Sequence, residues 1–343
     1  MEATRGNKKL VVAVIGYTGG VGRCLLGAMK KIGVLPSALV RSSTMKLGFV
    51  DDDTEEIPTD YDILSAYLLK KGGIPVIADV TASSTVQENY ATFLNLGISI
   101  VAANKGIFAG REDKYQALLT AAKEGKCRLL HETTVGAGLP TLGTLQSLKA
   151  SSHNIATVEG ILSGTLAFVL GQIAGGKKTL SQAVKEAKEL GYTEPDPRDD
   201  LNGMDVARKA VILARLAGMK GVELTGMTIE SLVPEPLRTC SLEEFMTKLC
   251  EHDESMADRV AKVEAAGGRL HFAAKVDVNQ NKVEVGMLSC EPSHPFNNAG
   301  PDNMVAITTN FYTRPLVIQG AGAGGDVTAT GVLADILQCA NQP

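Results

Sequence analysis

The feature that most constrains the fold lies at the start of the chain. Residues 10–15 read LVVAVI, a continuous apolar run typical of a parallel β-strand that is buried on both faces. The run is followed by GYTGGVG and then by apolar residues at helical spacing, namely Leu25, Leu26, Met29 and Ile32. A phosphate can approach the backbone N–H groups of a helix N-terminus only where no Cβ intervenes. The order of strand, glycine turn and helix therefore predicts a dinucleotide-binding unit.

The glycines of this turn have an unusual spacing. Gly16, Gly19 and Gly22 follow G-x-x-G-x-x-G, which is one residue longer than the usual G-x-G-x-x-G fingerprint. The spacing leaves open which glycine closes the turn and which faces the pyrophosphate. We expect the cofactor contacts of this loop to come from Gly16, Thr18, Gly19, Gly20, Val21 and Gly22.

The end of the second predicted strand bears on the choice of cofactor. Residues 38–40 lead into Arg41, Ser42 and Ser43, where an NAD-selective site would place an acid on the ribose 2′-hydroxyl. Arg41 and Ser42 instead offer hydrogen-bond donors for a 2′-phosphate. The sequence therefore favours NADP, with NAD possible. The alternative is that Arg41 is a surface residue.

Strands and helices continue to alternate through the first half of the chain. Strands are predicted over residues 75–81, 98–103 and 127–133, with one helix through 90–94 and another over 113–122. Such alternation indicates right-handed crossovers and a parallel sheet. Ligands bind beyond the carboxyl ends of such strands, where Thr81, Ser83 and Lys105 stand. Lys105 is thus a candidate for contacting cofactor or substrate, although a lysine at a strand end can equally be solvated.

The second half has a different pattern. A strand ending near residue 161 leads into a helix through Thr165, and a T-x-x-Q box at 179–182 opens a helix that ends at Gly191. Alternating strands are predicted around the turn 279–281 and over 303–309 and 314–320. We therefore predict an α/β protein with a Rossmann-type doubly wound parallel sheet and a second, α+β domain with a mainly antiparallel or mixed sheet.

An acidic loop is the most unusual stretch of the second half. Residues 194–209 read EPDPRDDLNGMDVARK, with five carboxylates in sixteen residues. Like charges repel, so the stretch is either a solvated turn or a site built for a charged ligand. Asp205 and Lys209 lie one turn apart on the helix that follows. Such a pair is usually a surface salt bridge, but a loop of this kind can also hold an ammonium group and position a lysine proton donor.

Composition narrows the class of partner. The chain has 343 residues, 44% of them apolar, which is enough for two hydrophobic cores. Its net charge of -4 gives no basic field for nucleic acid or anionic membranes. No apolar run approaches the roughly 20 residues of a membrane span, and the short run after the basic N-terminus is better explained as a strand than as a signal peptide. We expect a soluble, cytoplasmic protein with small-molecule substrates and six reduced, mostly buried cysteines.

The run AKELGYTEPDPRDDLNGMDVARK over residues 187–209 resembles the homoserine dehydrogenase signature. Other pieces follow in the order of that family: VAANK (101–105), HETTVGAGLP (131–140), ILSGTL (161–166), GPDNMV (300–305) and PLVIQGAGAGGDVTATGVLADIL (315–337). The resemblance covers nearly the whole chain. It implies an enzyme that reduces L-aspartate 4-semialdehyde reversibly to L-homoserine with a nicotinamide cofactor, in threonine, methionine and isoleucine biosynthesis.

The resemblance also implies roles for particular residues. Lys209 resembles the proton donor to the developing alkoxide, and Lys105 resembles a second lysine at the hydroxyl, near the nicotinamide. Asp205 is expected to be a catalytic residue and, with Glu194, resembles the substrate-binding carboxylates of the family. Substrate-binding residues are expected to be Glu194, Asp200 and Thr165, and cofactor-binding residues to include Thr81, Ser83, Lys105, Gly191 and Gly324. A structural cation, sodium in the family, is expected on the carbonyls of Glu132, Val135, Ala137 and Leu139. From the residues alone, that last loop can equally be an ordinary turn.

Three regions follow from the resemblance. Residues 1–131 with 325–343 are expected to bind the dinucleotide, 132–143 with 304–324 to form a dimerisation region, and 144–303 to form the catalytic domain of a homodimer. The final helix, after Asp326, is expected to pack on the dinucleotide domain. The chain ends soon after GAGAG, so we expect a monofunctional enzyme without the C-terminal regulatory domain of many relatives, and no direct inhibition by threonine through such a domain.

Two other functions fit parts of the sequence. The loop GYTGGVG is closer to that of aspartate-semialdehyde dehydrogenases, which need a nucleophilic cysteine, but Cys127 and Cys290 stand in strand-like apolar settings. The second alternative is a catalytically silent sensor that binds NADP and keeps the fold but catalyses no reaction. The presence of Lys105, Glu194, Asp205 and Lys209 together argues against that reading.

Overall fold

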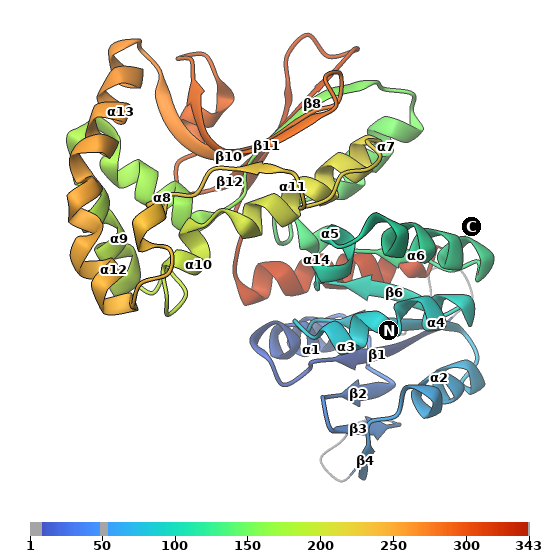
Figure 1. Ribbon diagram of the computed structural model, residues 1–343. Helices are drawn as coiled ribbons and strands as arrows, with labels where there is room; N and C mark the ends of the chain where they lie inside the picture. Colours follow the sequence, from blue (N-terminus) through green and yellow to red (C-terminus); the bar gives the residue numbers. More distant parts are fainter. Residues whose placement is uncertain (1–8, 49–53, 342–343) are drawn as a thin grey trace. The chain divides into compact units, whose positions relative to one another are not determined.

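The chain forms two compact units (Figure 1). This computed structural model describes residues 9–48 and 54–341. Unit 1 consists of the described residues of Met1–Leu142 and Ala323–Pro343, and unit 2 of Gly143–Gly322. The predicted fold class, a Rossmann-type parallel sheet with a second domain built on a mixed sheet, is confirmed. The three-region division, including the dimerisation region, stays a prediction.

A parallel sheet is the centre of unit 1. Within the described residues this sheet has seven strands in the order β4-β3-β2-β1-β5-β6-β7. The parallel strands are β1 (Leu10–Ile15), β2 (Ala38–Val40), β5 (Ile74–Asp79), β6 (Ser99–Ala102) and β7 (Leu129–Leu130). Residues 11–15 of β1 are all buried, as expected for an apolar strand covered on both faces. β7 is shorter than predicted because the short 3₁₀ helix η1 (Glu132–Thr134) begins just after it.

One edge of this sheet was not predicted. β3 (Thr44–Leu47) pairs antiparallel with β2, and β4 (Glu56–Pro58) pairs antiparallel with β3. Strands this short leave too few residues for an alternating pattern to be recognised. Helix α2 (Tyr61–Lys70), which follows, was also missed, although the Asp60 side chain caps it by accepting from the N–H groups of Asp62 and Ile63.

The remaining helices of unit 1 cover the sheet. They are α1 (Gly20–Lys31), α3 (Ser84–Glu88), α4 (Tyr90–Asn95), α5 (Gly106–Ala109), α6 (Glu112–Glu124) and α14 (Gly325–Cys339). Val12 and Val14 of β1 pack in one core cluster with Leu25 of α1 and Ile336 of α14. The last helix of the chain therefore packs on the dinucleotide unit, as predicted. The single helix predicted through residues 90–94 is two helices that meet at Asn89.

Unit 2 is built on a mixed sheet. Within the described residues its six strands have the order β13-β12-β8-β10-β11-β9, and all neighbours are antiparallel except β11 and β9. The strands are β8 (Ile155–Ile161), β9 (Thr228–Ile229), β10 (Arg269–Asp277), β11 (Lys282–Cys290), β12 (Asn303–Thr309) and β13 (Leu316–Gly320). The alternating patterns predicted around residues 279–281 and after 303 correspond to β10 to β13.

Helices complete unit 2. They are α7 (Thr141–Ala150, which begins at the end of unit 1), α8 (Gly164–Ile173), α9 (Leu180–Glu189), α10 (Arg198–Leu201), α11 (Met204–Ala217), α12 (Leu242–Lys248) and α13 (Asp253–Ala265). Four short 3₁₀ helices add η2 (Ala174–Gly176), η3 (Glu235–Leu237), η4 (Leu249–His252) and η5 (Pro295–Asn298). The predicted capping box is present, because Thr179 accepts from the Gln182 N–H and the Gln182 side chain accepts from the Thr179 N–H.

Two expectations from composition can be compared with the structure. In the described part of the chain, every helix is too short or too polar to cross a membrane. The six cysteines are free thiols, as expected. They are less buried than expected, however, because only Cys290 and Cys339 are fully buried and Cys250 is exposed.

Candidate active site

The glycine loop after β1 has separate roles for its glycines. Gly16 has a φ of +90°, and a Cβ placed on it would lie 2.6 Å from Thr81 Cγ2. A Cβ on Gly22 would lie 2.3 Å from the carbonyl oxygen of Gly16. No atom would lie within 4 Å of a Cβ on Gly20. Gly16 and Gly22 therefore close the turn, while Gly20 leaves open space beside the start of α1.

The N-terminus of α1 is suited to an anion. Gly19 is its N-cap, the helix has 12 residues, and its first turn contains no acidic residue. The first N–H groups of a helix lack intrahelical partners and carry the positive end of the helix dipole. Thr18, Gly19 and Gly20 are exposed and Val21 is partly exposed, so these groups can be approached from solvent. The residues present thus fit the pyrophosphate of a dinucleotide.

Arg41 and Ser42 follow β2, but Arg41 already has an acidic partner. Its Nε donates to Thr44 Oγ1 at 2.7 Å, and its guanidinium forms an ion pair with Glu56 at the start of β4. Hydrogen bonds from Thr44 and Arg41 lower the pKa of Glu56, which keeps this carboxylate ionised at neutral pH. Sequence reasoning missed Glu56 because the acid lies on the unpredicted edge strand.

The ends of β5 and β6 bring three predicted residues to one edge of the sheet. Asp79, the last residue of β5, accepts a hydrogen bond from the Thr81 N–H at 2.8 Å. Asn104 follows β6, and its Nδ2 donates to the Ser83 carbonyl at 2.9 Å. Lys105 comes next and is the N-cap of α5. Thr81, Ser83 and Lys105 therefore lie at the carboxyl end of the sheet, where ligands of such folds bind.

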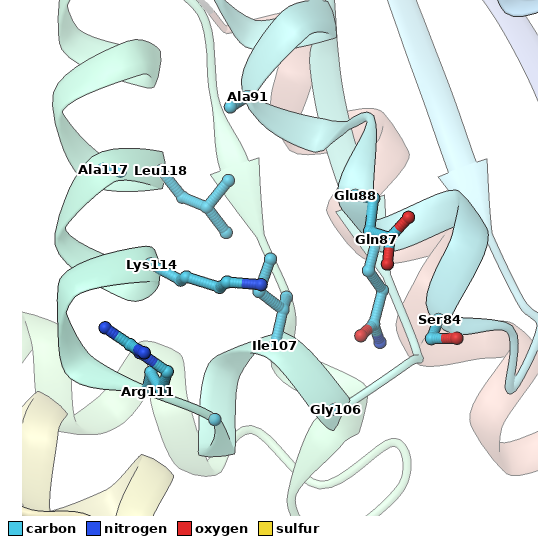
Figure 2. Close-up of a pocket in the computed structure, with 11 residues that line it drawn as sticks. Ser84, Gln87, Glu88, Ala91, Gly106, Ile107, Arg111, Lys114, Ala117 and Leu118 are labelled. Atoms are coloured by element: carbon cyan, nitrogen blue, oxygen red, sulfur yellow. The ribbon is translucent and has the colours of Figure 1, made fainter.

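A groove borders the Lys105 loop in unit 1. It has a volume of about 440 Å³ and is lined by residues of α3, α4, α5 and α6 (Figure 2). Leu118 and Ile107 give it an apolar floor, and the Lys114 side chain extends across it. The Gln87 side chain runs down to Gly106, the residue after Lys105.

Lys209 is a largely buried lysine on α11 of unit 2. Its Nζ donates to the Leu162 carbonyl at 2.6 Å and pairs with Asp205 Oδ2 at 2.8 Å. The side chain of Lys209 is only 13% exposed, whereas that of Asp205 is 38% exposed. A largely buried ammonium group needs such partners to offset its lost hydration. The geometry therefore favours the interpretation of this pair as a built site over that of a solvated surface pair.

The acidic loop is held in place by its own side chains. Asp200 Oδ2 accepts from the Glu194 N–H at 2.8 Å. The Thr165 hydroxyl donates to the Tyr192 carbonyl at 2.5 Å, and its oxygen lies 3.3 Å from Asp200 Oδ1. The structure thus brings Thr165 and Asp200 together with the backbone of Glu194, whose side chain is exposed. Gly191 ends α9 with a φ of +72° and belongs to unit 2, whereas Gly324 is the N-cap of α14 in unit 1.

Arg198 is a structural residue of this loop that sequence reasoning missed. Its guanidinium donates to both carboxylate oxygens of Asp196 and to the carbonyls of Leu237 and Cys240. It also lies over the Phe245 ring, 5.5 Å from the ring centre. The spacing of Asp196 and Arg198 gave a signal for the ion pair, but the carbonyl partners lie about 40 residues further along the chain.

We expect Arg198→Ala to lower the free energy of unfolding by about 2 kcal/mol, because it removes the guanidinium that a carboxylate and two carbonyls share as a hydrogen-bond donor. The KM for the substrate should rise as the loop loses its anchor. Thermal unfolding and steady-state kinetics measure the two effects. Arg111→Ala is a matched control, since Arg111 pairs with Asp113 at the same spacing but both side chains are mostly exposed. Equal losses in both variants would contradict the anchoring role.

The loop expected to hold a cation has backbone features that suit a sharp turn. Gly136 and Ala137 have φ of +80° and +53°. The carbonyl of Glu132 accepts from the Val135 N–H, and that of Leu139 accepts from the Thr141 N–H. Each carbonyl oxygen has two lone pairs, so the carbonyls of Glu132 and Leu139 each keep one that is available to a cation. Over residues 9–48 and 54–341, no cluster of three His, Cys, Asp or Glu side chains could replace them.

Fold and site together define a class of protein. A dinucleotide-type glycine loop with an anion site, and a buried lysine paired with a carboxylate, are the parts of an NAD(P)-dependent oxidoreductase. The family model "Homoserine dehydrogenase" matches residues 140–337, and "Homoserine dehydrogenase, NAD binding domain" matches 18–132. The chain belongs to the homoserine dehydrogenase family, whose members act on a CH–OH group. The predicted family resemblance is confirmed.

Individual relatives agree with this assignment. The homoserine dehydrogenase of Schizosaccharomyces pombe is 38% identical, with 100% of this chain and 98% of that protein covered. Bifunctional aspartokinase/homoserine dehydrogenase 1 of Zea mays is 39% identical over 96% of this chain, which matches 38% of the maize protein. Among solved structures, a Candida auris protein of unknown function has a TM-score of 0.92 at 35% identity, covering 97% of this chain and 99% of that one. A hyperthermophilic archaeal homoserine dehydrogenase mutant in complex with NADPH has a TM-score of 0.73 at 25% identity, covering 97% and 98%.

Proposed function

We propose that this enzyme reduces L-aspartate 4-semialdehyde reversibly to L-homoserine with NADP(H), as a step toward threonine, methionine and isoleucine, in the cytoplasm. The observation that carries the proposal is the largely buried ammonium of Lys209, held by Asp205 and the Leu162 carbonyl. The archaeal relative in complex with NADPH supports the choice of cofactor.

The proposed chemistry assigns the proton to Lys209. The nicotinamide supplies the hydride when it is bound. As the carbonyl carbon of the semialdehyde is reduced, negative charge grows on its oxygen, and an ammonium group within hydrogen-bond reach stabilises that charge and donates a proton. Asp205 pairs with the Lys209 ammonium and orients it, and Lys105 acts as the second cation at the same oxygen.

The substrate is a zwitterion, so its ammonium group needs an anionic partner. Glu194 offers an exposed carboxylate for that purpose. Asp200 and Thr165 support Glu194 through the hydrogen bonds that hold residues 192 and 194. Such bonds orient the loop before the substrate arrives, which reduces the entropy lost on binding.

The rival dehydrogenase chemistry is disfavoured by the state of its cysteines. Burial raises the pKa of Cys127 to about 11 and that of Cys290 to about 12. A thioester mechanism needs a thiolate near neutral pH, so neither thiol is suited to it.

The function is tested by incubating the purified protein with L-homoserine and either NADP or NAD, and following the absorbance of the reduced nicotinamide. Reduction that depends on homoserine and is faster with NADP is expected. Absence of homoserine-dependent reduction with either cofactor would reject the proposal, and would favour a silent dinucleotide-binding sensor if NADPH still bound.

Arg41 gives a separate test of cofactor choice. We expect Arg41→Asp to weaken NADPH binding at least about tenfold and NADH binding much less, because a charge-assisted hydrogen bond to the 2′-phosphate is lost. Glu56→Gln should strengthen NADPH binding, since it removes the acid that competes for Arg41. Quenching of nicotinamide fluorescence measures both affinities. Equal effects of Arg41→Asp on the affinities for NADPH and NADH would contradict the assignment of Arg41 to the 2′-phosphate.

We also propose a homodimer in which residues 132–143 and 304–324 form the dimerisation region. β13 is an edge strand of its sheet, and Val317 on it and Phe311 and Tyr312 just before it are exposed. Unpaired strand edges with apolar side chains favour pairing with a second copy. Light scattering after gel filtration should give about twice the chain mass of 36.1 kDa. A monomer mass at micromolar concentration would contradict the dimer.

The carbonyls of Glu132, Val135, Ala137 and Leu139 are proposed to hold a structural sodium ion. The support is the turn geometry of this loop, with its two left-handed residues, and the hard-cation preference of carbonyl oxygens.

A further inference from the structure

Asp79 is a buried carboxylate that the proposed chemistry does not use. It is 0% exposed and ends β5. Within residues 9–48 and 54–341, no lysine or arginine forms an ion pair with it. The hydrogen-bond donors to its carboxylate include the Thr81 N–H (2.8 Å), the Tyr90 hydroxyl (2.6 Å) and Asn104 Nδ2 (3.5 Å). Burial raises the pKa of Asp79 above its ordinary value, and the hydrogen-bond donors offset only part of this rise. Burying such a group is costly, so a role beyond packing is expected.

The donors connect Asp79 to the loop that carries Lys105. Asn104 precedes Lys105 and is 7% exposed. Its Nδ2 reaches Asp79 and the Ser83 carbonyl, and its Oδ1 lies 3.4 Å from the N–H of Gly106, which follows Lys105. The main chain adds another link, because the Ala103 N–H donates to the Asp79 carbonyl at 2.9 Å. The backbone of Lys105 is therefore tied to β5 through the residues on both sides of it.

The other side of this loop is packed as well. A Cβ on Gly106 would lie 2.7 Å from Gln87 Oε1, so the Gln87 amide fills the space that a side chain would take. Figure 2 shows the Gln87 side chain reaching Gly106 from α3. The loop thus has packing from Gln87 and hydrogen bonds from Asn104, and little room to move.

We propose that Asp79 is a positioning residue for the reaction, which fixes through Asn104 the backbone from which Lys105 extends. This inference rests on the proposed function, in which Lys105 is the second cation at the reacting oxygen. Displacement of a catalytic group by about 1 Å can cost about 100-fold in rate. The Asp79 carboxylate also accepts a hydrogen bond from the N–H of Thr81, a proposed cofactor contact. Asp79 therefore orders the residues that follow β5 and those that follow β6.

Asparagine is the informative replacement at position 79. Asp79→Asn keeps the size of the side chain and one acceptor oxygen for the Thr81 N–H. It replaces the oxygen that faces Tyr90 and Asn104 with an NH₂ group, which is a donor and cannot accept from Asn104. The link to Asn104 is therefore lost with little change in volume.

The test is a double-mutant cycle on kcat for homoserine oxidation with NADP. Asp79→Asn should lower kcat about 100-fold in the wild-type background. In the Lys105→Ala background the same change should lower kcat less than about threefold, because the group that Asp79 positions is already gone. A merely structural role would lower kcat by the same factor in both backgrounds. Asp335→Asn, which alters another buried carboxylate of unit 1, is the matched control, and its factor should be the same in both backgrounds.

The outcomes separate the inference from the proposed function. A wild-type protein that does not oxidise homoserine overturns the proposed function. An active wild type with equal losses in both backgrounds, or with no loss for Asp79→Asn or for Lys105→Ala, overturns only the inference. Thermal unfolding and NADPH titration of each variant identify misfolded protein. If Asp79→Asn does not fold, Asn104→Ala cuts the same link from the other side, and its cycle with Lys105→Ala must show the same loss of effect.

Discussion

Lys209→Ala is expected to lower kcat by about 10²- to 10⁴-fold while NADPH still binds, because general acid catalysis contributes on that order. The Lys209 ammonium contacts the Leu162 carbonyl and Asp205, both in unit 2, whereas the proposed anion site at the start of α1 belongs to unit 1. Cofactor affinity should therefore change less than about threefold. Steady-state kinetics with homoserine and fluorescence titration with NADPH measure the two quantities.

Lys248→Ala is the matched control for this prediction. Lys248 pairs with Glu244 at the same i,i+4 spacing as Lys209 with Asp205, at 2.6 Å, but its side chain is 48% exposed instead of 13%. If catalysis depends on the buried setting of Lys209, and not merely on an i,i+4 ion pair, Lys248→Ala should leave kcat unchanged. Unchanged turnover of Lys209→Ala would remove the proposed mechanism. A large loss in both variants would point to a general effect of breaking helix salt bridges.

Much of the fold could be predicted because its strongest signals are local. The run LVVAVI, the glycines after it and the capping box at Thr179 each determine structure within a few residues. The edge strands β3 and β4 were missed because they depend on pairing with β2. Strand pairing is a long-range interaction, and short strands carry little propensity signal of their own.

The candidate site was predictable to a similar extent. Helical spacing placed Asp205 and Lys209 on one face of a helix, which the structure agrees with. The Leu162 carbonyl, which completes the setting of Lys209, lies 47 residues away in sequence, and no local pattern indicates it. Glu56 opposite Arg41 is a similar case, because its place depends on strand register. Local patterns thus pointed to candidate residues, whereas tertiary contacts determine how buried these residues are and which charged groups they pair with.

The second large effect is expected at the glycine loop. A Cβ on Gly22 would lie 2.3 Å from the Gly16 oxygen and 2.6 Å from Tyr17 Cα, both of them backbone atoms. Backbone in a tight turn cannot shift without opening the turn, so Gly22→Ala should lower the free energy of unfolding by about 1–3 kcal/mol. The opened turn should also raise the Kd for NADPH at least about tenfold, since the N–H groups at the start of α1 are displaced.

Two other glycines of α1 test why Gly22→Ala should lose both stability and affinity for NADPH. A Cβ on Gly27 meets no atom within 4 Å, so Gly27→Ala should raise stability by about 0.5–1 kcal/mol and leave the Kd unchanged. Gly20→Ala also meets nothing, but its methyl group enters the open space where the pyrophosphate is expected. It should therefore weaken NADPH binding without loss of stability. If Gly22→Ala kept both its stability and its affinity for NADPH, the loop would not be the rigid anion site that its geometry indicates. If Gly20→Ala bound NADPH with unchanged affinity, the phosphates of the cofactor would not lie beside Gly20.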